Sequence, residues 1–445
     1  MFAVVCCSAV LVLGAGLVSR PLVNYLSDRE GFTVTVATRT VSKAEALVAG
    51  RSRGRAVPLD VTDDAALGRL VGEHDLAVSL LLATEHARVA RHCLSCGKHM
   101  ATTSYISAEM KALDSEARSR GLTFLNECGV DPGIDHMSAM RIFDGIHERG
   151  GRVTVFKSYC GGLPAPDAND NPLGYKFSWA PRGVLTAVRN GARFRWDGRL
   201  VEVAPRDLLA TVHHLEVAGA GTFEAYPNRD SLSYESAYGL SDLETIFRGT
   251  LRYPGHCARW KAWVDLGLFE IEPIVILDRT RAGVLRAVLD LDRSADLPAE
   301  VARALGVERD ADPVATLGWL GMYDETTIPD GMDAPLDVLA DAMLAKMPFR
   351  PGERDMLIMH HEVVGAFPGR TERITMDLVD FGIPHGDSAM ARTVALPVAI
   401  GVKHVLQGTF QARGVLAPVV PEIYRPILDE LEALGISCSE RTEIL

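Results

Sequence analysis

The chain has 445 residues, which is enough for two or three domains with large cores. Its formal net charge of −12 argues against nucleic acid or an anionic membrane surface as the main partner, so an anionic substrate needs a locally positive pocket. The eight cysteines are scattered and a chain of this size needs no disulfides, so we expect a reducing cytoplasm. We expect no membrane span, because no apolar run is long enough to cross a bilayer: MFAVVCCSAVLVLG is short, lacks a basic flank and continues into a glycine turn.

The stretch from Ala9 to Thr40 predicts a strand, a tight glycine turn, a helix and a second strand, after a leader from Met1 to Ser8 to which we assign no role. AVLVLGAG is a continuous apolar run, as expected of a strand buried on both faces of a parallel sheet, and it ends on Gly14 and Gly16. Such a turn lets backbone amides approach a pyrophosphate at a helix N-terminus. Ser19 replaces the third glycine or alanine of this pattern, which predicts slightly looser packing of the helix against the strand.

The second strand, Phe32 to Ala37, ends where dinucleotide-binding domains carry the residue that contacts the ribose. No acidic residue follows it; the chain continues with Thr38, Arg39 and Thr40. A guanidinium beside two hydroxyls favours a 2′-phosphate by roughly 1.5–3 kcal/mol, which predicts an NADP(H) site. The alternative is a surface arginine without a ligand.

Four further strands are predicted, with amphipathic helices between them: Ala56 to Val61, Leu76 to Leu82, His99 to Thr103 and Leu122 to Cys128. This alternation predicts a doubly wound parallel sheet of six strands, whose ligand binds at the carboxyl ends of the strands. The residues at those ends are Asp60, Val61, Leu81, Thr103, Ser104 and the stretch from Glu127 to Pro132. Each of them also has a packing explanation.

A helix is predicted from about Ile134 to Glu148, closed by Gly150 and Gly151. Asp131 before Pro132 is typical of a helix start, so the simplest interpretation of Asp131 is an N-terminal cap. It could cap the helix and still border the cofactor, because the last strand points at the same cleft. The CLSC pair formed by Cys93 and Cys96 is interpreted as two incidental helix cysteines.

From Arg152 the pattern changes to α+β. VTVFKSYCGG predicts a strand, and ARFRWDGRLVEV predicts a hairpin turning at Asp197 and Gly198. The segment SYCGGLPAPDANDNPLGYKFSW is long and rich in Gly, Pro and Asn, so we interpret it as a binding loop. The arginines of AYPNRDS and RGTLRY suit carboxylate recognition by a bidentate fork, although exposed turn arginines are the alternative.

The stretch from Pro254 to about Arg350 predicts several helices that form a separate helical domain. A hairpin follows, MLIMHHEVVGAF and RTERITMDLVDF around Pro368 and Gly369, and is expected to join the sheet of the second domain. Two helices, Ser388 to Leu406 and Pro421 to Leu434, are predicted to finish the chain.

Eight motifs together resemble the glutamate-forming saccharopine dehydrogenase (saccharopine reductase) family, over nearly the whole chain: GAGLVSRP, TTSYIS, GVDPGIDHM, SYCGGLPAP, NPLGYKFSW, YPNRDS, RGTLRY and DSAMARTVALP. The resemblance implies interconversion of saccharopine, NADP+ and water with L-glutamate, 2-aminoadipate 6-semialdehyde and NADPH. It also implies a homodimer. Where relatives often carry a Pro-aromatic pair before a histidine, this chain has LLLATEH, with Leu82 and Ala83 in those places.

The resemblance implies three domains: a Rossmann domain (1–131, completed by helices at about 395–445), an α+β substrate and dimerisation domain (132–253 and about 354–394) and an all-α domain (254–353). Its cofactor contacts fall on Gly14, Ala15, Gly16, Leu17, Val18, Thr38, Arg39, Thr40, Asp60, Val61, Leu81, Thr103, Ser104, Val130, Asp131, Pro132 and Ser178. Its saccharopine contacts fall on Ser104, Asp131, Arg229, Thr250, Leu251 and Arg252.

The chemistry agrees with these residue types, because saccharopine carries three carboxylates and its oxidised carbon must be hydrolysed. Asp131 and Cys160 are the candidates for orienting the amine or moving protons, although a cysteine that ends a buried strand is usually only packed there. No metal is implied. Two other functions stay open: a related reductive-condensation enzyme, such as a carboxynorspermidine dehydrogenase, and a non-catalytic NADP-binding redox sensor.

Overall fold

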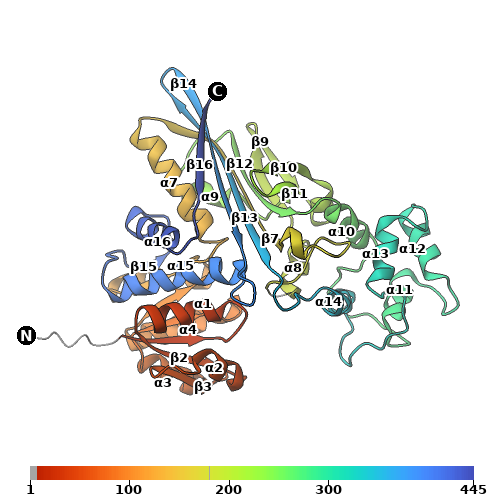
Figure 1. Ribbon diagram of the computed structural model, residues 1–445, viewed down its shortest axis with the longest axis horizontal. Coiled ribbons are helices and arrows are strands. Elements are labelled where there is room, and N and C mark those ends of the chain that lie inside the picture. The colour runs from red at the N-terminus through yellow and green to blue at the C-terminus, as the bar shows by residue number, and fades with distance from the viewer. Residues whose placement is uncertain (1–7, 180) are drawn as a thin grey trace, which may run out of the picture. The chain divides into compact units, whose positions relative to one another are not determined.

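The computed structural model describes residues 8–179 and 181–445 (Figure 1). The leader expected from Met1 to Ser8 therefore lies, up to residue 7, outside the described residues. The described chain folds into two compact units. The first contains the residues up to Arg152 together with Gly386–Glu440, and the second contains Val153–His385 and Arg441–Leu445.

A parallel sheet forms the centre of the first unit. Among the described residues it has seven strands, in the order β15-β6-β5-β4-β1-β2-β3. Both neighbours of β1 run parallel to it, and Val10 to Leu13 are buried, as the apolar run predicts. The strands are β1 (Ala9–Leu13), β2 (Thr33–Thr38), β3 (Gly54–Pro58), β4 (Leu76–Ser79), β5 (His99–Thr102), β6 (Thr123–Leu125) and β15 (Gly414–Leu416). The doubly wound fold is confirmed; the seventh strand, β15, is not among the predicted ones.

Helices from both ends of the chain cover this sheet, as the red and blue ribbons of Figure 1 show. The Tyr25 hydroxyl donates to the Glu430 carboxylate at 2.6 Å, and Lys403 pairs with the same carboxylate at 2.8 Å. These contacts join η1 to the two C-terminal helices. The helices of the unit are α1 (Ser19–Asn24), η1 (Tyr25–Arg29), α2 (Val41–Val48), α3 (Asp64–Gly72), η2 (Ala83–Glu85), α4 (His86–Cys96), α5 (Ala108–Lys111), α6 (Asp114–Ser119), α7 (Ile134–Glu148), α15 (Ala389–Leu406) and α16 (Pro421–Ala433).

Helix α15 corrects the expectation that no apolar run is long enough to span a membrane. Its 18 residues have a mean hydropathy of 1.3, which suffices for a span by length and composition. However, 67% of the helix is buried inside the structure, and it packs against α1. The apolar residues of α15 therefore belong to the core of the first unit.

The second unit is built on a mixed sheet. Its main path runs β10-β11-β12-β7-β13-β14-β16. Outside this path, β8 pairs with β12, and β9 pairs with β8. The predicted hairpin around Pro368 and Gly369 is confirmed as β13 and β14, which join this sheet beside β7. The strands are β7 (Arg152–Pro164), β8 (Ala192–Trp196), β9 (Arg199–Val203), β10 (His213–Val217), β11 (Gly221–Pro227), β12 (Thr245–Arg252), β13 (Asp355–Phe367), β14 (Arg370–Phe381) and β16 (Ser439–Ile444).

The hairpin of β8 and β9 turns at Asp197 and Gly198, as predicted. Both residues have positive φ, 48° and 77°, the conformation that a tight hairpin turn requires. The last strand, β16, is absent from the predicted elements. All six of its residues are exposed, so it lacks the apolar alternation that marks a half-buried strand.

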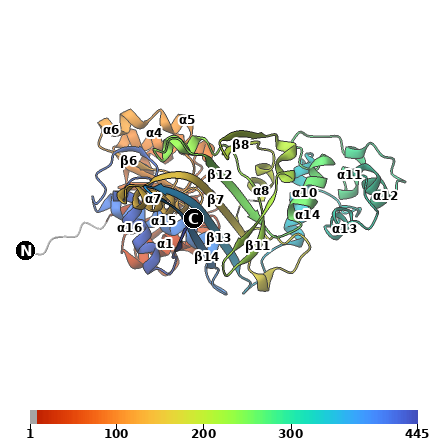
Figure 2. The same cartoon turned by 90° about the horizontal axis from the view of Figure 1, so that it is seen from above.

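The helices of the second unit share a core with its sheet. Trp260 and Leu339 belong to the same buried cluster as Tyr159 and Phe247 of the strands. Figure 2 shows α10 to α14 gathered at one end of this unit. The helices are η3 (Pro166–Ala168), α8 (Pro181–Ala187), η4 (Pro205–Ala210), α9 (Ser233–Ala237), α10 (His256–Asp265), α11 (Arg281–Leu289), α12 (Leu297–Leu305), α13 (Asp312–Trp319) and α14 (Pro335–Lys346). The three-domain division with its boundaries stays a prediction.

Candidate active site

The glycine turn after β1 leaves room for a ligand at the carboxyl edge of the first sheet. Gly14 has φ 109°, and a Cβ there would lie 3.0 Å from the Leu80 carbonyl oxygen, so only glycine fits without strain. A Cβ on Gly16 would meet nothing within 4 Å. The next residue, Leu17, is 69% exposed although it is apolar. This loop fits a pyrophosphate that approaches the backbone closely.

The Ser19 side chain forms two hydrogen bonds with the backbone of the glycine turn. Its hydroxyl accepts a hydrogen bond from the Gly16 amide at 3.0 Å and donates to the Gly14 carbonyl at 3.3 Å. The side chain is fully buried, so a serine at this position does not leave the start of α1 exposed. The expected looser packing is therefore accompanied by two hydrogen bonds that hold the loop.

The ends of β2 and β3 lie beside the turn. The Gly14 amide donates to the Ala37 carbonyl at 2.9 Å, and the Leu59 amide donates to the Thr38 carbonyl at 3.0 Å. Arg39 is exposed, and among the described residues none forms a hydrogen bond or ion pair with its side chain. The pKa of Asp60 is lowered by hydrogen bonds from Thr62 and, to a smaller extent, by the positive charge of Arg39. Arg39 is thus available to an anionic ligand at this edge.

The other predicted cofactor residues of the first unit follow the neighbouring strands. Leu81 continues from Leu80, whose amide donates to the Leu13 carbonyl at 2.9 Å. The Ser104 carbonyl accepts from the Glu127 amide at 3.0 Å. A Cβ on Gly129, next to Val130, would lie 3.2 Å from the Thr103 Cβ. The structure therefore brings the predicted residues after β4, β5 and β6 to the same edge as the glycine turn.

His86 is the first residue of α4 and is not among the predicted site residues. Its Nδ1 lies 2.8 Å from the Ser79 hydroxyl, and its Nε2 lies 2.8 Å from the Ser104 hydroxyl. The ring is buried, and burial lowers the pKa of His86 to about 4, so the imidazole is neutral at physiological pH. The motif LLLATEH contains this histidine, but its contacts depend on the ends of strands β4 and β5 meeting the start of α4 in space.

The structure contradicts the interpretation of Asp131 as a helix cap. Helix α7 begins at Ile134, the cap position is Gly133, and the amide of Gly133 donates to the Asp135 carboxylate at 2.5 Å. A Cβ on Gly133 would lie 2.0 Å from the Gly129 carbonyl, so the backbone crosses itself tightly before the helix starts. Asp131 instead accepts a hydrogen bond from the Tyr105 hydroxyl at 3.1 Å. Tyr105, in the motif TTSYIS, is missing from the predicted site.

A half-buried carboxylate and a buried histidine support the loops around Asp131. Glu127 accepts from the Ile106 amide at 2.8 Å and lies 2.8 Å from Nε2 of His136, which is 1% exposed. Glu127 thereby joins the loop after β5 to the start of α7. Sequence analysis places Glu127 at a strand end, without this role.

In the second unit the sheet brings Cys160 and the RGTLRY motif together. Strands β7 and β12 pair in parallel, with Cys160 opposite Thr250, and β11 pairs with β12 so that Tyr226 also lies opposite Thr250. Residues opposite each other on paired strands project to the same face. Cys160, Thr250 and Arg252 therefore belong to one face of this sheet.

Arg252 is a buried cation without a carboxylate. The residue is 6% exposed, and its guanidinium lies over the rings of Tyr175 and Tyr226, with 5.1 and 5.9 Å between the guanidinium carbon and the ring centres. Within residues 8–179 and 181–445 it forms no ion pair, its one hydrogen bond goes to the Leu251 carbonyl at 2.8 Å, and its Nε has no partner. A buried charge of this kind is costly unless a ligand pairs with it.

Two further predicted residues of the second unit differ in burial. Arg229 follows β11, is exposed, has φ 55°, and its carbonyl accepts from the Arg193 amide at 2.9 Å. Ser178 is 8% exposed, and in the part of the chain that the structure describes its hydroxyl has no hydrogen-bond partner. Like the Nε of Arg252, this hydroxyl is a buried polar group that a ligand could satisfy.

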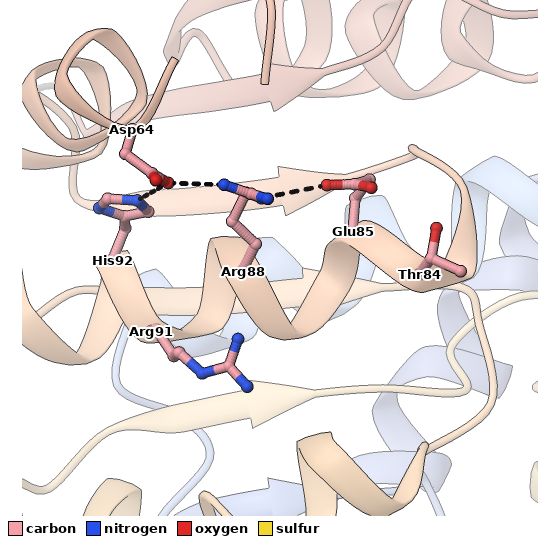
Figure 3. Close-up of a pocket in the computed structure, with 6 residues that line it drawn as sticks. All are labelled: Asp64, Thr84, Glu85, Arg88, Arg91 and His92. Carbon is pink, nitrogen blue, oxygen red and sulfur yellow. Dashed lines mark hydrogen bonds and ion pairs between the residues drawn. The ribbon is translucent and has the colours of Figure 1, made fainter. Parts of the chain in front are cut away.

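A pocket of about 330 Å³ lies elsewhere on the first unit (Figure 3). Asp64 contacts Arg88 at 2.9 Å and His92 at 3.1 Å, and Arg88 contacts Glu85 at 3.2 Å, so these charges neutralise one another. Figure 3 shows the Arg91 side chain pointing away from this group. The pocket is lined by Asp64, Thr84, Glu85, Arg88, Arg91 and His92. None of these is a predicted site residue.

Comparison with protein families matches both units. Residues 10–125 match the saccharopine dehydrogenase NADP binding domain, and residues 129–436 match the saccharopine dehydrogenase C-terminal domain. A protein of Schizosaccharomyces pombe named saccharopine dehydrogenase [NADP(+), L-glutamate-forming] is 39% identical over 446 residues, covering 97% of this chain and 98% of the relative. The protein of that name from Saccharomyces cerevisiae is 40% identical over 442 residues, covering 97% and 99%.

Longer relatives and a solved structure agree with this assignment. The mitochondrial alpha-aminoadipic semialdehyde synthase of Bos taurus is 36% identical over 98% of this chain, which corresponds to 48% of that protein. The apo structure of saccharopine dehydrogenase (L-Glu forming) from Saccharomyces cerevisiae superposes with a TM-score of 0.87 at 37% identity, covering 98% of this chain and 100% of that one. The chain therefore belongs to the saccharopine dehydrogenase family.

Proposed function

We propose that this protein interconverts saccharopine, NADP+ and water with L-glutamate, 2-aminoadipate 6-semialdehyde and NADPH, a reaction of lysine metabolism. The observation that carries the proposal is the buried Arg252 guanidinium, which has no carboxylate among the described residues. A substrate with three carboxylates supplies the missing partner, and a charge-assisted hydrogen bond is worth roughly 1.5–3 kcal/mol. Relatives named as the glutamate-forming enzyme match this chain over almost their whole length, which supports the same substrate.

NADP(H) is the proposed cofactor. The open glycine turn would hold the pyrophosphate, and Arg39, which has no ion pair among the described residues, would hold the 2′-phosphate with Thr38 and Thr40. When bound, the nicotinamide supplies hydride transfer. The other proposed contacts of this chain with the cofactor are Ala15, Leu17, Val18, Asp60, Val61, Leu81, Thr103, Ser104, Val130, Asp131, Pro132 and Ser178.

The protein's own residues orient the amino acid and move protons. Arg229 and Arg252 are proposed to bind two carboxylates, and Ser104, Asp131, Thr250 and Leu251 complete the contacts. Loss of hydride from the substrate carbon bonded to nitrogen leaves an iminium, which water attacks before the carbon–nitrogen bond breaks. Asp131, held by the Tyr105 hydroxyl, and Cys160, opposite Thr250, are the proposed groups for orienting the amine or transferring these protons.

We also propose a homodimer in the cytoplasm, formed through the α+β domain. The family resemblance supports the dimer. The scattered cysteines, six of which form no disulfide in the described chain, suit a reducing compartment.

The test is absorbance at the reduced-nicotinamide band, with the purified protein, saccharopine, and NADP+ or NAD+ in separate assays. NADPH formation from saccharopine supports the proposal. NADPH formation only with polyamine-derived secondary amines would favour a carboxynorspermidine dehydrogenase. NADPH binding without turnover of either substrate would favour a redox sensor and contradict the proposed activity.

A further inference from the structure

His86 links the inside of the first unit to a predicted substrate contact. It is 4% exposed, and its two ring nitrogens lie 2.8 Å from the hydroxyls of Ser79, at the end of β4, and Ser104, after β5. The Ser104 hydroxyl has no other hydrogen-bond partner among the described residues, and Ser104 is only half-buried. One end of this chain of hydroxyls is therefore sealed inside the protein, and the other end reaches the edge where the ligand is proposed to bind.

The buried end determines the direction of the hydrogen bonds. Ser79 is fully buried, and His86 Nδ1 is the sole hydrogen-bond partner of its hydroxyl within the described chain. If Nδ1 carried the proton, the Ser79 hydroxyl proton would be left without an acceptor, which is unfavourable in the interior. Ser79 therefore donates to Nδ1. Because a neutral imidazole carries one proton, that proton is on Nε2.

Thr102 does not reverse this assignment. Its hydroxyl lies 3.4 Å from His86 Nε2, at the outer limit of a hydrogen bond, and it also accepts from the Ser104 amide at 3.3 Å. The contacts of Ser79 and Ser104 with the ring are both 2.8 Å and therefore dominate. Burial lowers the pKa of His86 to about 4, which agrees with a neutral ring.

We propose that His86 is a positioning residue whose Nε2–H donates to Ser104, so that the Ser104 hydroxyl donates its own proton to a carboxylate oxygen of the bound amino acid. This inference rests on the proposed function and adds a specific requirement to it. Ser104 recognises a hydrogen-bond acceptor and not a donor. His86 acts through Ser104 and needs no contact with the substrate.

A double-mutant cycle tests this link. His86→Phe keeps the ring and removes both hydrogen bonds, and Ser104→Ala removes the contact with substrate. Each single change is expected to raise the KM for saccharopine about tenfold. In the Ser104→Ala background, His86→Phe should raise the KM no further. Independent, multiplicative effects on the KM, or an effect on NADP+ alone, would overturn the proposal.

His74 provides a matched control in the same unit. It is also 4% exposed and makes two hydrogen bonds, to the Leu70 carbonyl at 2.6 Å and the Thr35 hydroxyl at 2.7 Å, without contacting Ser104. His74→Phe should lower the thermal midpoint as His86→Phe does and leave the KM for saccharopine unchanged. If His86→Phe does not fold, Ser79→Ala replaces it, because loss of the buried donor frees the tautomer and should raise the KM about threefold. An unchanged KM in Ser79→Ala would then refute the link.

The tautomer can be measured without turnover. In histidine labelled with ¹⁵N, the two ring nitrogens of His86 should show a protonated Nε2 and an unprotonated Nδ1, with Ser79→Ala shifting that balance. A proton on Nδ1 in the unaltered protein would overturn the inference whatever the enzyme assay shows. Absence of NADPH formation from saccharopine, with Nε2 protonated, would instead count against the proposed function alone.

Discussion

The hydroxyl of Ser19 lies 3.0 Å from the amide of Gly16 and accepts its hydrogen bond inside the glycine turn. The same hydroxyl donates to the Gly14 carbonyl at 3.3 Å, so it joins both glycines that flank the proposed pyrophosphate site. Dinucleotide-binding loops usually have glycine or alanine here, for close packing of helix and strand. In this chain a buried serine packs at that position and also restrains the loop.

Ser19→Ala should therefore weaken NADPH binding although alanine suits the fold. Loss of the acceptor for the Gly16 amide is expected to raise the dissociation constant for NADPH about threefold to tenfold, since a hydrogen bond is worth about 0.5–1.5 kcal/mol. Titration of protein fluorescence with NADPH measures it. The control is Thr280→Ala, which removes the cap of α11 in the other unit, where the Thr280 hydroxyl accepts from the Gly283 amide at 3.0 Å. Equal NADPH affinity in both variants would contradict a role for Ser19 in the loop.

Arg39→Asp should discriminate between the two cofactors. Since Arg39 has no ion pair or side-chain hydrogen bond among the described residues, its replacement breaks none there, and the new carboxylate would repel a 2′-phosphate. The KM for NADP+ is expected to rise ten- to a hundredfold or more, with a much smaller change for NAD+. Arg55→Asp, on the adjacent strand β3, serves as the charge-matched control. Parallel rises for both cofactors would refute a phosphate contact.

Arg252→Met should separate stability from substrate binding. Since the guanidinium is buried and no carboxylate of the described chain pairs with it, an apolar side chain of similar length is expected to raise the free energy of unfolding by about 1 kcal/mol or more. The KM for saccharopine should rise about ten- to a hundredfold.

The control for that change is Arg286→Met, in the same unit. Arg286 contacts Asp278 at 2.6 Å and also pairs with Glu325, so its loss leaves carboxylates unpaired and should destabilise the protein. Urea unfolding compares the two variants. If Arg252→Met were as destabilising as Arg286→Met, Arg252 would have a structural role.

Asp131→Asn should lower turnover without weakening the fold. The cap position of α7 is Gly133, whose amide donates to the Asp135 carboxylate, and an asparagine oxygen at position 131 can still accept from the Tyr105 hydroxyl. Loss of the charge is expected to lower kcat about a hundredfold if Asp131 orients the amine or transfers a proton. The thermal midpoint should stay within error of the unaltered protein. Unchanged kcat would assign the chemistry to another group.

His86 should make the fold sensitive to mild acid. Its pKa is about 4 in the folded protein against an ordinary value of 6.5, so the unfolded chain takes up the proton first as the pH falls. The contribution of the neutral His86 ring to the free energy of unfolding is complete above about pH 6.5 and is lost progressively down to about pH 4. Between pH 7 and pH 5 it amounts to about 2 kcal/mol. His86→Phe should remove that part of the pH dependence of urea unfolding, and an unchanged dependence would disprove the assignment.

Much of the first unit could be predicted because its signals are local. The apolar run before Gly14, the alternation of strands and helices, and the absence of an acid after β2 are all visible in short windows of sequence. Strands β15 and β16 were beyond such reasoning. The first has three residues, and the second is exposed throughout, so neither shows a periodic apolar pattern.

The sequence by itself determined the fold class, the glycine turn, the NADP-type residues and, through its motifs, the family. Only the tertiary structure decided that Asp131 faces Tyr105 and does not cap α7, that Arg252 is buried with no carboxylate partner in the part of the chain that is described, and that His86 joins Ser79 to Ser104. The physical reason is the distance along the chain between the interacting groups. Strand and turn preferences act between neighbours in the chain, whereas burial, pKa and hydrogen-bond direction depend on groups that only folding brings together.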